Sequence, residues 1–117
     1  MNNKACKYII SLIRTIPISV HKGQHALLLA DNSAESIALF GFFLKNNVPL
    51  ILLNASMRDE QVQEYMDEYR PQWFMYPKNR NLPQYSGGQT GHSENRKRYQ
   101  CYETACEWNG YVIASRG

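Results

Sequence analysis

Short apolar runs and amphipathic stretches alternate along the first 77 residues. Apolar residues recur at spacings of three and four between Ala5 and Ile13, which predicts an amphipathic helix that ends before Pro17. The run Ala26 to Ala30 is continuously apolar between polar flanks, which predicts a strand buried on both faces. Leu50 to Leu53 form a second predicted buried strand, and Trp73 to Tyr76 a third.

Two more helices are expected between these strands, each with a capping residue at its start. Asn32, followed three positions later by Glu35, is expected to cap the first, whose run Ile37 to Leu44 is apolar nearly all round. Ser56 and Asp59 repeat this pattern before the second helix. A single apolar stripe predicts that this second helix lies on the surface. Its members are Val62, Tyr65, Met66 and Tyr69.

The order strand, helix, strand, helix, strand with short connections predicts parallel strands joined by right-handed crossovers. Residues 1–77 therefore form an α/β block in this interpretation. The expected fold class is α/β: three-layer, with a mostly parallel sheet between flanking helices, plus a C-terminal β-hairpin. Gly41 lies inside an apolar helix, where glycine is unfavourable, and predicts close packing against a neighbouring strand.

The composition changes after the third strand. Residues 78–98 contain Asn, Gly, Ser, Pro, Gln and basic residues with almost no aliphatic ones, which predicts a flexible linker. Residues 99–117 are expected to form the hairpin, with strands Tyr99–Thr104 and Tyr111–Ser115 around the turn Asn109-Gly110.

The third strand, rich in aromatic residues, is also a candidate for an exposed apolar sheet edge. An exposed edge seeks a partner, so we expect a homo-oligomer formed by strand pairing or by exchange of the hairpin. In the alternative, the hairpin folds back and covers this edge within one chain.

Composition and charge exclude several protein classes. The chain has 117 residues, of which 44% are hydrophobic and 20% charged, as in ordinary globular domains. Its net charge of only +3 argues against a nucleic-acid partner. No apolar run approaches the roughly 20 residues of a membrane span, and Met1 to Lys7 do not resemble a secretory signal. We therefore expect no membrane partner and a cytoplasmic location.

The residues with chemical potential do not form a recognisable site. Cys6, Cys101 and Cys106 are interpreted as free thiols, with a disulfide between the last two as the alternative. The histidines lack metal-ligand spacing, and no Ser or Cys lies in a nucleophile turn. The histidines are His21, His25 and His92. We therefore predict no catalytic, cofactor-binding or metal-binding residue in this chain.

Two motifs in the predicted linker have a functional and a structural interpretation. The Gly-rich stretch Ser86–Gly91 is similar to phosphate-binding loops, but no buried strand precedes it and no helix pattern follows, so a flexible linker is preferred. The basic cluster Arg96–Arg98 next to Tyr99 could contact nucleic acid, but we prefer to interpret it as a solvated end of the linker.

The stretch Ala26–Asn54 resembles the opening of the adenylate-forming enzymes, the AMP-dependent acyl synthetases and ligases. The resemblance covers about Gln24 to Pro77 and rests on three landmarks. These are Asn32-Ser33 with Glu35, Val48-Pro49-Leu50 after the apolar helix, and Tyr69-Arg70-Pro71 before a strand. Asn47 stands where the family often has Gly.

The resemblance implies a ligase that uses ATP and Mg to activate a carboxylic acid, with ATP held by a Ser/Thr/Gly-rich loop that ends in Lys. This chain lacks that loop, because Gln89, Ser93 and Glu94 depart from its pattern. We therefore expect an N-terminal scaffold fragment whose partner is the remainder of the ligase chain and which is inactive alone. ATP and Mg are implied only for the full-length enzyme. The alternative is a free-standing small-ligand or protein-binding module with its site in the loops after Asp31 and Asn54.

Overall fold

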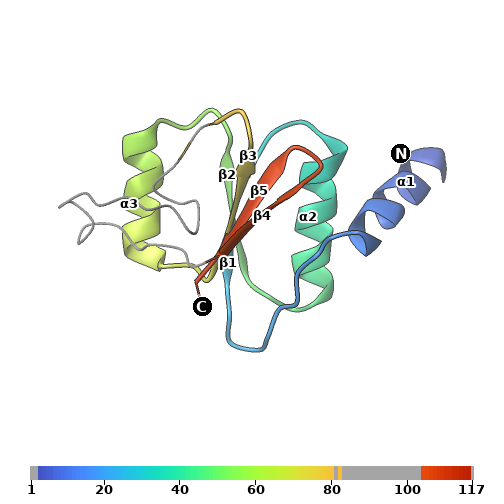
Figure 1. The fold of residues 1–117 in the computed structure, drawn as a ribbon, viewed down its shortest axis with the longest axis horizontal. Coiled ribbons are helices and arrows are strands. Elements are labelled where there is room, and N and C mark those ends of the chain that lie inside the picture. Colours follow the sequence, from blue (N-terminus) through green and yellow to red (C-terminus); the bar gives the residue numbers. More distant parts are fainter. Residues whose placement is uncertain (1–2, 81, 83–103, 117) are drawn as a thin grey trace.

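The computed structural model describes residues 3–80, 82 and 104–116, which form a small α/β domain (Figure 1). These residues contain three helices and one five-stranded mixed sheet. The elements are α1 (Asn3–Arg14), β1 (Ala26–Ala30), α2 (Ala34–Lys45), β2 (Leu50–Asn54), α3 (Asp59–Tyr69), β3 (Trp73–Pro77), β4 (Thr104–Trp108) and β5 (Tyr111–Ser115). The predicted α/β class, with a parallel core and a C-terminal hairpin, is confirmed.

The strand order is β2-β1-β3-β5-β4. β1 pairs in parallel with β2 and β3, whereas β5 runs antiparallel to both β3 and β4. The prediction that β3 forms an exposed edge is therefore wrong. In β3, Met75 is fully buried and lies opposite Ile113 of β5, so the alternative, in which the hairpin covers this strand, is confirmed.

Helices cover both faces of the sheet, which Figure 1 shows edge-on with α3 on one side and α1 and α2 on the other. Because successive side chains of a strand point to opposite faces, Leu28 packs in the cluster that contains Phe43 of α2. Leu27 packs in the other cluster, with Val62 of α3. All four side chains are fully buried, so the prediction that β1 is buried on both faces is confirmed.

β2 differs from the prediction of a second buried strand. Leu50, Ile51 and Leu53 are only partly buried, and the side chain of Leu52 is 51% exposed. An edge strand has a sheet neighbour on one side only, so its side chains have fewer groups to pack against. The apolar sequence predicted the strand correctly but not its position at the edge.

Both helix caps also differ from the prediction. α2 begins at Ala34 with Ser33 as its N-cap, because the Ser33 hydroxyl accepts a hydrogen bond from the Ser36 N–H at 3.1 Å. Asn32 therefore lies one residue before the cap. α3 begins at Asp59, and its N-cap Arg58 makes no side-chain capping bond.

Ser56, the expected cap of α3, has another partner. Its hydroxyl donates to Oδ1 of Asn54 at 2.7 Å, and its backbone N–H donates to the same oxygen at 2.8 Å. This local turn engages the side chain two residues before the helix N-cap, so it is not used as a cap.

Gly41 allows a close approach between two helices and not between a helix and a strand. A Cβ atom at this position would lie 3.2 Å from Cδ1 of Ile13 in α1. The predicted strand contact is therefore wrong, although close packing is present.

The residue after α1 is joined to the hairpin, because Nε1 of Trp108 donates to the Thr15 hydroxyl at 2.9 Å.

The first residues of the predicted linker, residues 78–80 and 82, are packed against the domain. The N–H of Lys78 donates to the Gly110 carbonyl at 2.7 Å, and Leu82 is only 2% exposed. The Tyr76 hydroxyl donates to the Leu82 carbonyl at 3.3 Å. These four residues of the predicted linker therefore belong to the packed domain, because their groups find partners on β3, on the turn between β4 and β5, and on the loop before α3. The motifs Ser86–Gly91 and Arg96–Arg98 and the residues His92 and Cys101 lie outside the described residues.

The hairpin is shifted from its prediction. β5 occupies the predicted range Tyr111–Ser115, whereas β4 runs over Thr104–Trp108 and so continues past Thr104, where the predicted strand ended. The turn residues Asn109 and Gly110 have φ angles of 47° and 88°, as a tight two-residue turn requires. Such a turn leaves no room for a loop, so the strand before it must continue to Trp108. Residues 99–103 lie outside the described part of the chain.

Within the described ranges, none of the helices has the length and apolar character needed to cross a membrane. Cys6 and Cys106 are exposed free thiols.

Candidate functional site

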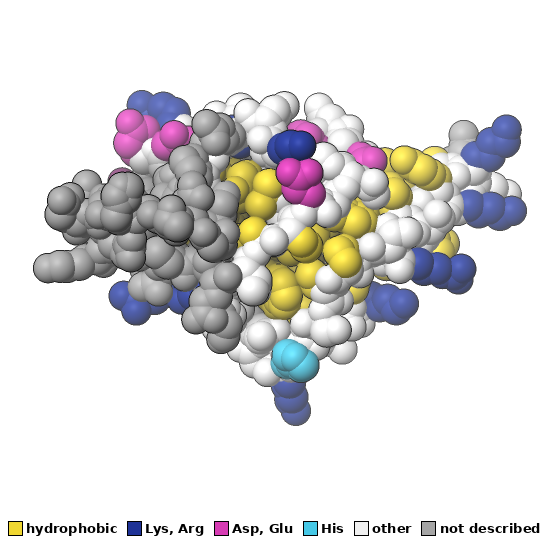
Figure 2. Space-filling view, in the orientation of Figure 1, with side chains coloured by type: hydrophobic (Ala, Val, Ile, Leu, Met, Phe, Trp, Pro, Cys, Tyr) yellow, Lys and Arg dark blue, Asp and Glu magenta, His cyan; other side chains and the backbone are white. Residues whose placement is uncertain are grey.

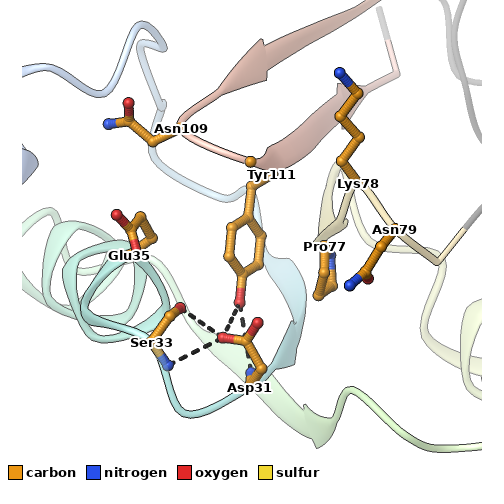
Figure 3. A pocket seen from close by; sticks show the side chains of 9 residues that line it. Asp31, Ser33, Glu35, Pro77, Lys78, Asn79, Asn109 and Tyr111 are labelled. Carbon is orange, nitrogen blue, oxygen red and sulfur yellow. Dashed lines mark hydrogen bonds between the residues drawn. The ribbon is translucent and has the colours of Figure 1, made fainter.

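A pocket of about 550 Å³ opens at the carboxyl ends of the parallel strands (Figure 3). Asp31 follows β1, Lys78 and Asn79 follow β3, and Tyr111 begins β5. The remaining lining residues are Ser33, Glu35, Pro77, Asn109 and Gly110. From β1 the chain crosses through α2 to β2 on one side and returns through α3 to β3 on the other. The pocket therefore lies where the strand order reverses, which is the usual ligand position in open α/β sheets.

Asp31 is the centre of a hydrogen-bond network between the turn before α2 and the hairpin. Its Oδ1 accepts hydrogen bonds from the Ser33 N–H at 3.1 Å and from the Tyr111 hydroxyl at 2.8 Å. The hydroxyl groups of Ser33 and Ser36 also donate to this oxygen. The Ser36 hydroxyl forms a further short contact with that of Tyr111. The network joins positions 80 residues apart in the sequence.

These contacts determine the protonation of the two titratable groups. Burial raises the pKa of Asp31, but hydrogen bonds from Ser33, Tyr111 and Ser36 outweigh this effect and hold the pKa below the ordinary value of 3.8. Burial raises the pKa of Tyr111 above its ordinary value. At neutral pH Asp31 is an anion and Tyr111 a neutral phenol. A carboxylate with a lowered pKa is a weak base, so Asp31 is suited to accept hydrogen bonds and not to abstract protons.

The pocket lining also carries polar side chains and charges of both signs. Nζ of Lys78 lies 3.2 Å from Oε1 of Glu107, and both side chains are more than half exposed. Glu35 adds a second carboxylate, and Asn79 and Asn109 supply amides. Such a wall can hold a small polar molecule by hydrogen bonds. Among the described residues, no cluster of His, Cys, Asp and Glu has the arrangement of a metal site.

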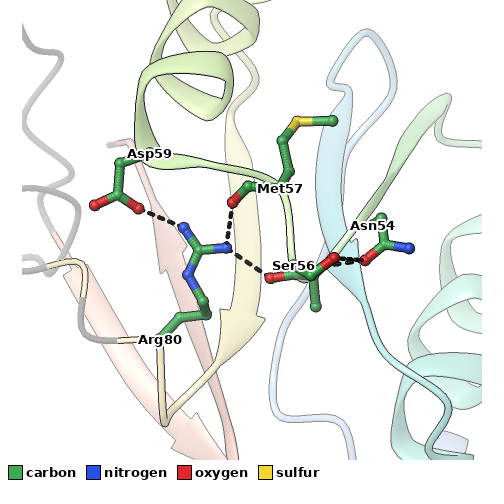
Figure 4. Close-up of polar contacts among 6 residues, drawn as sticks. Asn54, Ser56, Met57, Asp59 and Arg80 are labelled. Carbon is green, nitrogen blue, oxygen red and sulfur yellow. Dashed lines mark hydrogen bonds and ion pairs between the residues drawn. The ribbon is translucent and has the colours of Figure 1, made fainter.

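Arg80 joins the segment after β3 to the loop before α3 (Figure 4). Its Nη1 donates to the carbonyls of Ala55 and Met57 at 2.6 and 2.7 Å, and its Nη2 pairs with Asp59. The Arg80 side chain is only 18% exposed, so the guanidinium is a structural clamp between the ends of β2 and β3. Asn54, at the end of β2, binds Ser56 and does not line the pocket.

No residue of this site was predicted as a catalytic, cofactor-binding or metal-binding residue. The loop after Asp31 was named only in the alternative of a binding module, because it follows a predicted strand. Lys78, Asn79 and Tyr111 were missed because residue 78 was taken as the start of a linker and Tyr111 as part of a separate hairpin. The turn Asn109-Gly110 predicts the hairpin but not that β5 pairs with β3, so no local signal could have found them.

The predicted histidines lie away from this edge. His21 is exposed, and His25 flanks the start of β1 at the opposite end of the strands, where its Nε2 lies 2.6 Å from the Tyr69 carbonyl oxygen. His25 therefore flanks a strand and does not line the pocket. His92 lies outside the described residues.

The surface around α1 is basic. Figure 2 shows Lys and Arg side chains projecting from this end of the molecule, while the acidic side chains on this face lie elsewhere. α1 carries Lys4, Lys7 and Arg14 and no acidic residue. None of these three residues lines the pocket, so this charge is not part of the candidate site.

Comparison of the chain with known protein families, with curated protein sequences and with solved structures finds no match. Its function therefore has to be inferred from the residues and geometry of the domain itself.

Proposed function

We propose that this domain is the N-terminal scaffold of an AMP-forming ligase, in which a three-layer α/β arrangement supports the activation of a carboxylic acid with ATP. The observation that carries the proposal is where the three landmarks of the family resemblance lie. Asn32-Ser33 with Glu35 form the start of α2, Val48-Pro49-Leu50 lead into β2, and Tyr69-Arg70-Pro71 lead from α3 towards β3. Each landmark lies at a junction between a strand and a helix.

The contacts of these landmarks are structural. Ser33 caps α2, and Val48 is buried while its N–H donates to the Phe43 carbonyl at 2.9 Å. Arg70 ends α3 in the left-handed region with φ 45°, and its N–H donates to the Met66 carbonyl. Capping and backbone contacts of this kind hold elements in place. They support a scaffold role for this part of the proposed enzyme.

The backbone at Asn47 also supports the proposal. Its φ angle is 59°, in the left-handed region that glycine adopts without strain and that asparagine tolerates better than most residues. The resembled family often has Gly at this position, so the Asn in this chain meets the same backbone requirement.

The outer surface of α2 offers a place for the proposed remainder of the ligase chain. Ile37, Phe40 and Leu44 form a stripe at helical spacing and are 46%, 39% and 60% exposed. An apolar stripe of this kind is typical of a surface that packs against another element. In the proposed enzyme, ATP and Mg bind to the remainder of the chain and not to the described residues.

Two measurements test the scaffold proposal. Isotope exchange between pyrophosphate and ATP, measured on the 117-residue chain with a panel of carboxylic acids, should remain at background. Robust exchange would contradict a scaffold role. The coding DNA after Gly117 should continue in frame into a strand and a Ser/Thr/Gly-rich loop that ends in Lys, and a stop codon between intact neighbouring genes would contradict the ligase.

The pocket at Asp31 favours a second candidate, a small-ligand-binding module. It lies at the switch point of the parallel strands, and its wall combines carboxylates, amides and an ammonium group. NMR titration with a panel of small polar molecules tests this candidate. Shifts confined to residues around Asp31 and Asn79, lost in Asp31→Asn, would support it, and an absence of saturable shifts across the panel would contradict it.

A further inference from the structure

β2 is an open edge of the sheet in the described part of the chain. It pairs with β1 on one side, and no described strand pairs with its other side. The opposite edge of the described sheet is β4, which pairs only with β5 among the described strands. An unpaired edge offers backbone donors and acceptors to a strand of another chain.

The hydrogen bonds at the two ends of β2 show which of its groups face outward. The Pro49 carbonyl accepts from the Ala26 N–H at 2.9 Å, and the Ala55 N–H donates to the Ala30 carbonyl at 2.8 Å. Odd-numbered residues therefore face β1, because backbone groups alternate in direction along a strand. The outward-facing residues are Leu50, Leu52 and Asn54.

These outward groups are largely unused within the described chain. The Asn54 carbonyl already accepts a hydrogen bond from the Met57 N–H at 3.0 Å. The free groups are therefore both the N–H and the C=O of Leu50 and Leu52, together with the N–H of Asn54.

The two sheet edges differ in protection against pairing. β2 has the sequence Leu-Ile-Leu-Leu-Asn without a charged residue, and Leu52 is 51% exposed. β4 carries the charged Glu107, which pairs with Lys78. Charge on an edge strand discourages pairing with another strand. The favoured partner of β2 is therefore a strand without charge, and a second β2 meets this condition.

We propose that a second copy of this chain pairs with β2 in antiparallel orientation around a two-fold axis at Leu52. In this register Leu52 exchanges two backbone hydrogen bonds with its equivalent in the second copy. The N–H of Asn54 donates to the Leu50 carbonyl of the other copy, and the reverse bond follows by symmetry. The contact uses the same surface on both copies, so it closes as a dimer that continues the sheet across the interface.

The alternative pairing of β2 with β4 of another copy has a different consequence. That contact uses two different surfaces, so each added copy leaves one β2 and one β4 free, and growth does not stop at two chains. The number of chains in the assembly therefore distinguishes the two arrangements.

The test uses two variants of Leu52 and one control. Leu52→Pro removes an outward N–H without removing a hydrogen bond to β1, and proline is tolerated on an edge strand. Leu52→Lys places a charge beside its equivalent across the two-fold axis. Ala105→Lys places the same charge at an exposed position of the other edge. Thermal unfolding verifies that each variant is folded. If the proline variant does not fold, Leu52→Lys alone tests the proposal.

Sedimentation equilibrium or light scattering over a range of concentrations measures the outcome. The unmodified chain and Ala105→Lys should rise from one chain to a plateau at two chains. Leu52→Lys and Leu52→Pro should raise the dimer dissociation constant by more than about tenfold. The proposal is overturned by a mass of one chain at every concentration, by unchanged dimerisation of the folded Leu52 variants, by loss of association in Ala105→Lys, or by growth without a plateau.

Discussion

Removal of the Tyr111 hydroxyl tests whether the Asp31 network stabilises the domain. Tyr111→Phe keeps the ring, which is only 2% exposed, and removes one donor to the Asp31 carboxylate together with the contact to Ser36. A hydrogen bond to a charged group contributes about 1.5–3 kcal/mol. Asp31 retains donors from Ser33 and Ser36 and is partly solvated. We therefore expect a value at or below the lower end of this range, a loss of about 1–2 kcal/mol in the free energy of unfolding.

The effect should depend on pH. The pKa of Asp31 is lower in the folded protein than its ordinary value of 3.8, so its contribution to stability is present above that value and is lost as the pH falls through the folded pKa. Without the Tyr111 donor the folded pKa rises towards 3.8, and this part of the stabilisation decreases. The difference between Tyr111→Phe and the unmodified chain should therefore be larger at pH 7 than at about pH 2.5.

Urea unfolding followed by circular dichroism at both pH values measures this difference, and NMR titration of Asp31 measures the pKa directly. Tyr8→Phe is the matched control, because Tyr8 is 51% exposed on α1, and it should unfold like the unmodified chain. A change below about 0.3 kcal/mol for Tyr111→Phe at pH 7, or an equal change at both pH values, would refute the reasoning.

Three further substitutions test other parts of the fold by urea unfolding. Arg80→Ala should lower the free energy of unfolding by about 1–3 kcal/mol, because it removes donors to two carbonyls and to Asp59. The control Arg58→Ala should change it little, since the Arg58 side chain makes no capping bond, and equal losses in the two variants would contradict the clamp. Gly41→Ala should leave the free energy of unfolding nearly unchanged, because a gain of about 1 kcal/mol in helix propensity is offset by the close contact with Ile13. Adding Ile13→Val should recover part of that gain, and a clear gain from Gly41→Ala alone would contradict the close packing. Asn47→Ala should lower the free energy of unfolding by about 1 kcal/mol, whereas Asn47→Gly should leave it unchanged or raise it. A lower stability of the Gly variant than of the Ala variant would contradict the left-handed backbone at this position.

The parallel half of the fold could be predicted because its local signals agree with its tertiary structure. Ala26–Ala30 and Trp73–Tyr76 are apolar runs bounded by polar residues or proline, and both are strands. The burial of Leu50–Leu53 could not be predicted, because a continuous apolar run looks the same in a central strand and at an edge. Asn32 and Ser33 are adjacent and both can cap a helix, so the local sequence did not distinguish them.

The hairpin and half of the site depended on contacts between distant residues. β4 contains exposed residues of mixed polarity, so its sequence lacks the alternation that marks a half-buried strand. Tyr111 reaches Asp31 only because β5 pairs with β3 in antiparallel register, which places the start of β5 at the carboxyl end of β3. Nothing in the sequence near Tyr111 or Lys78 indicates this register. From the sequence, therefore, only the loop after Asp31 could be linked to this edge, by its place after a strand.

Within the described sheet, β3 alone has a parallel neighbour on one side and an antiparallel neighbour on the other. This position has a consequence for the order of folding. The β4–β5 hairpin has a tight turn and local contacts, and hairpins form within about 1–10 μs. Pairing of β3 with β1 must first close the longer path through α2, β2 and α3, which is slower. Since β3 is the only part of the sheet to which β5 pairs outside its own hairpin, refolding should be limited by the arrival of β3 beside β1, with hairpin docking as a later step.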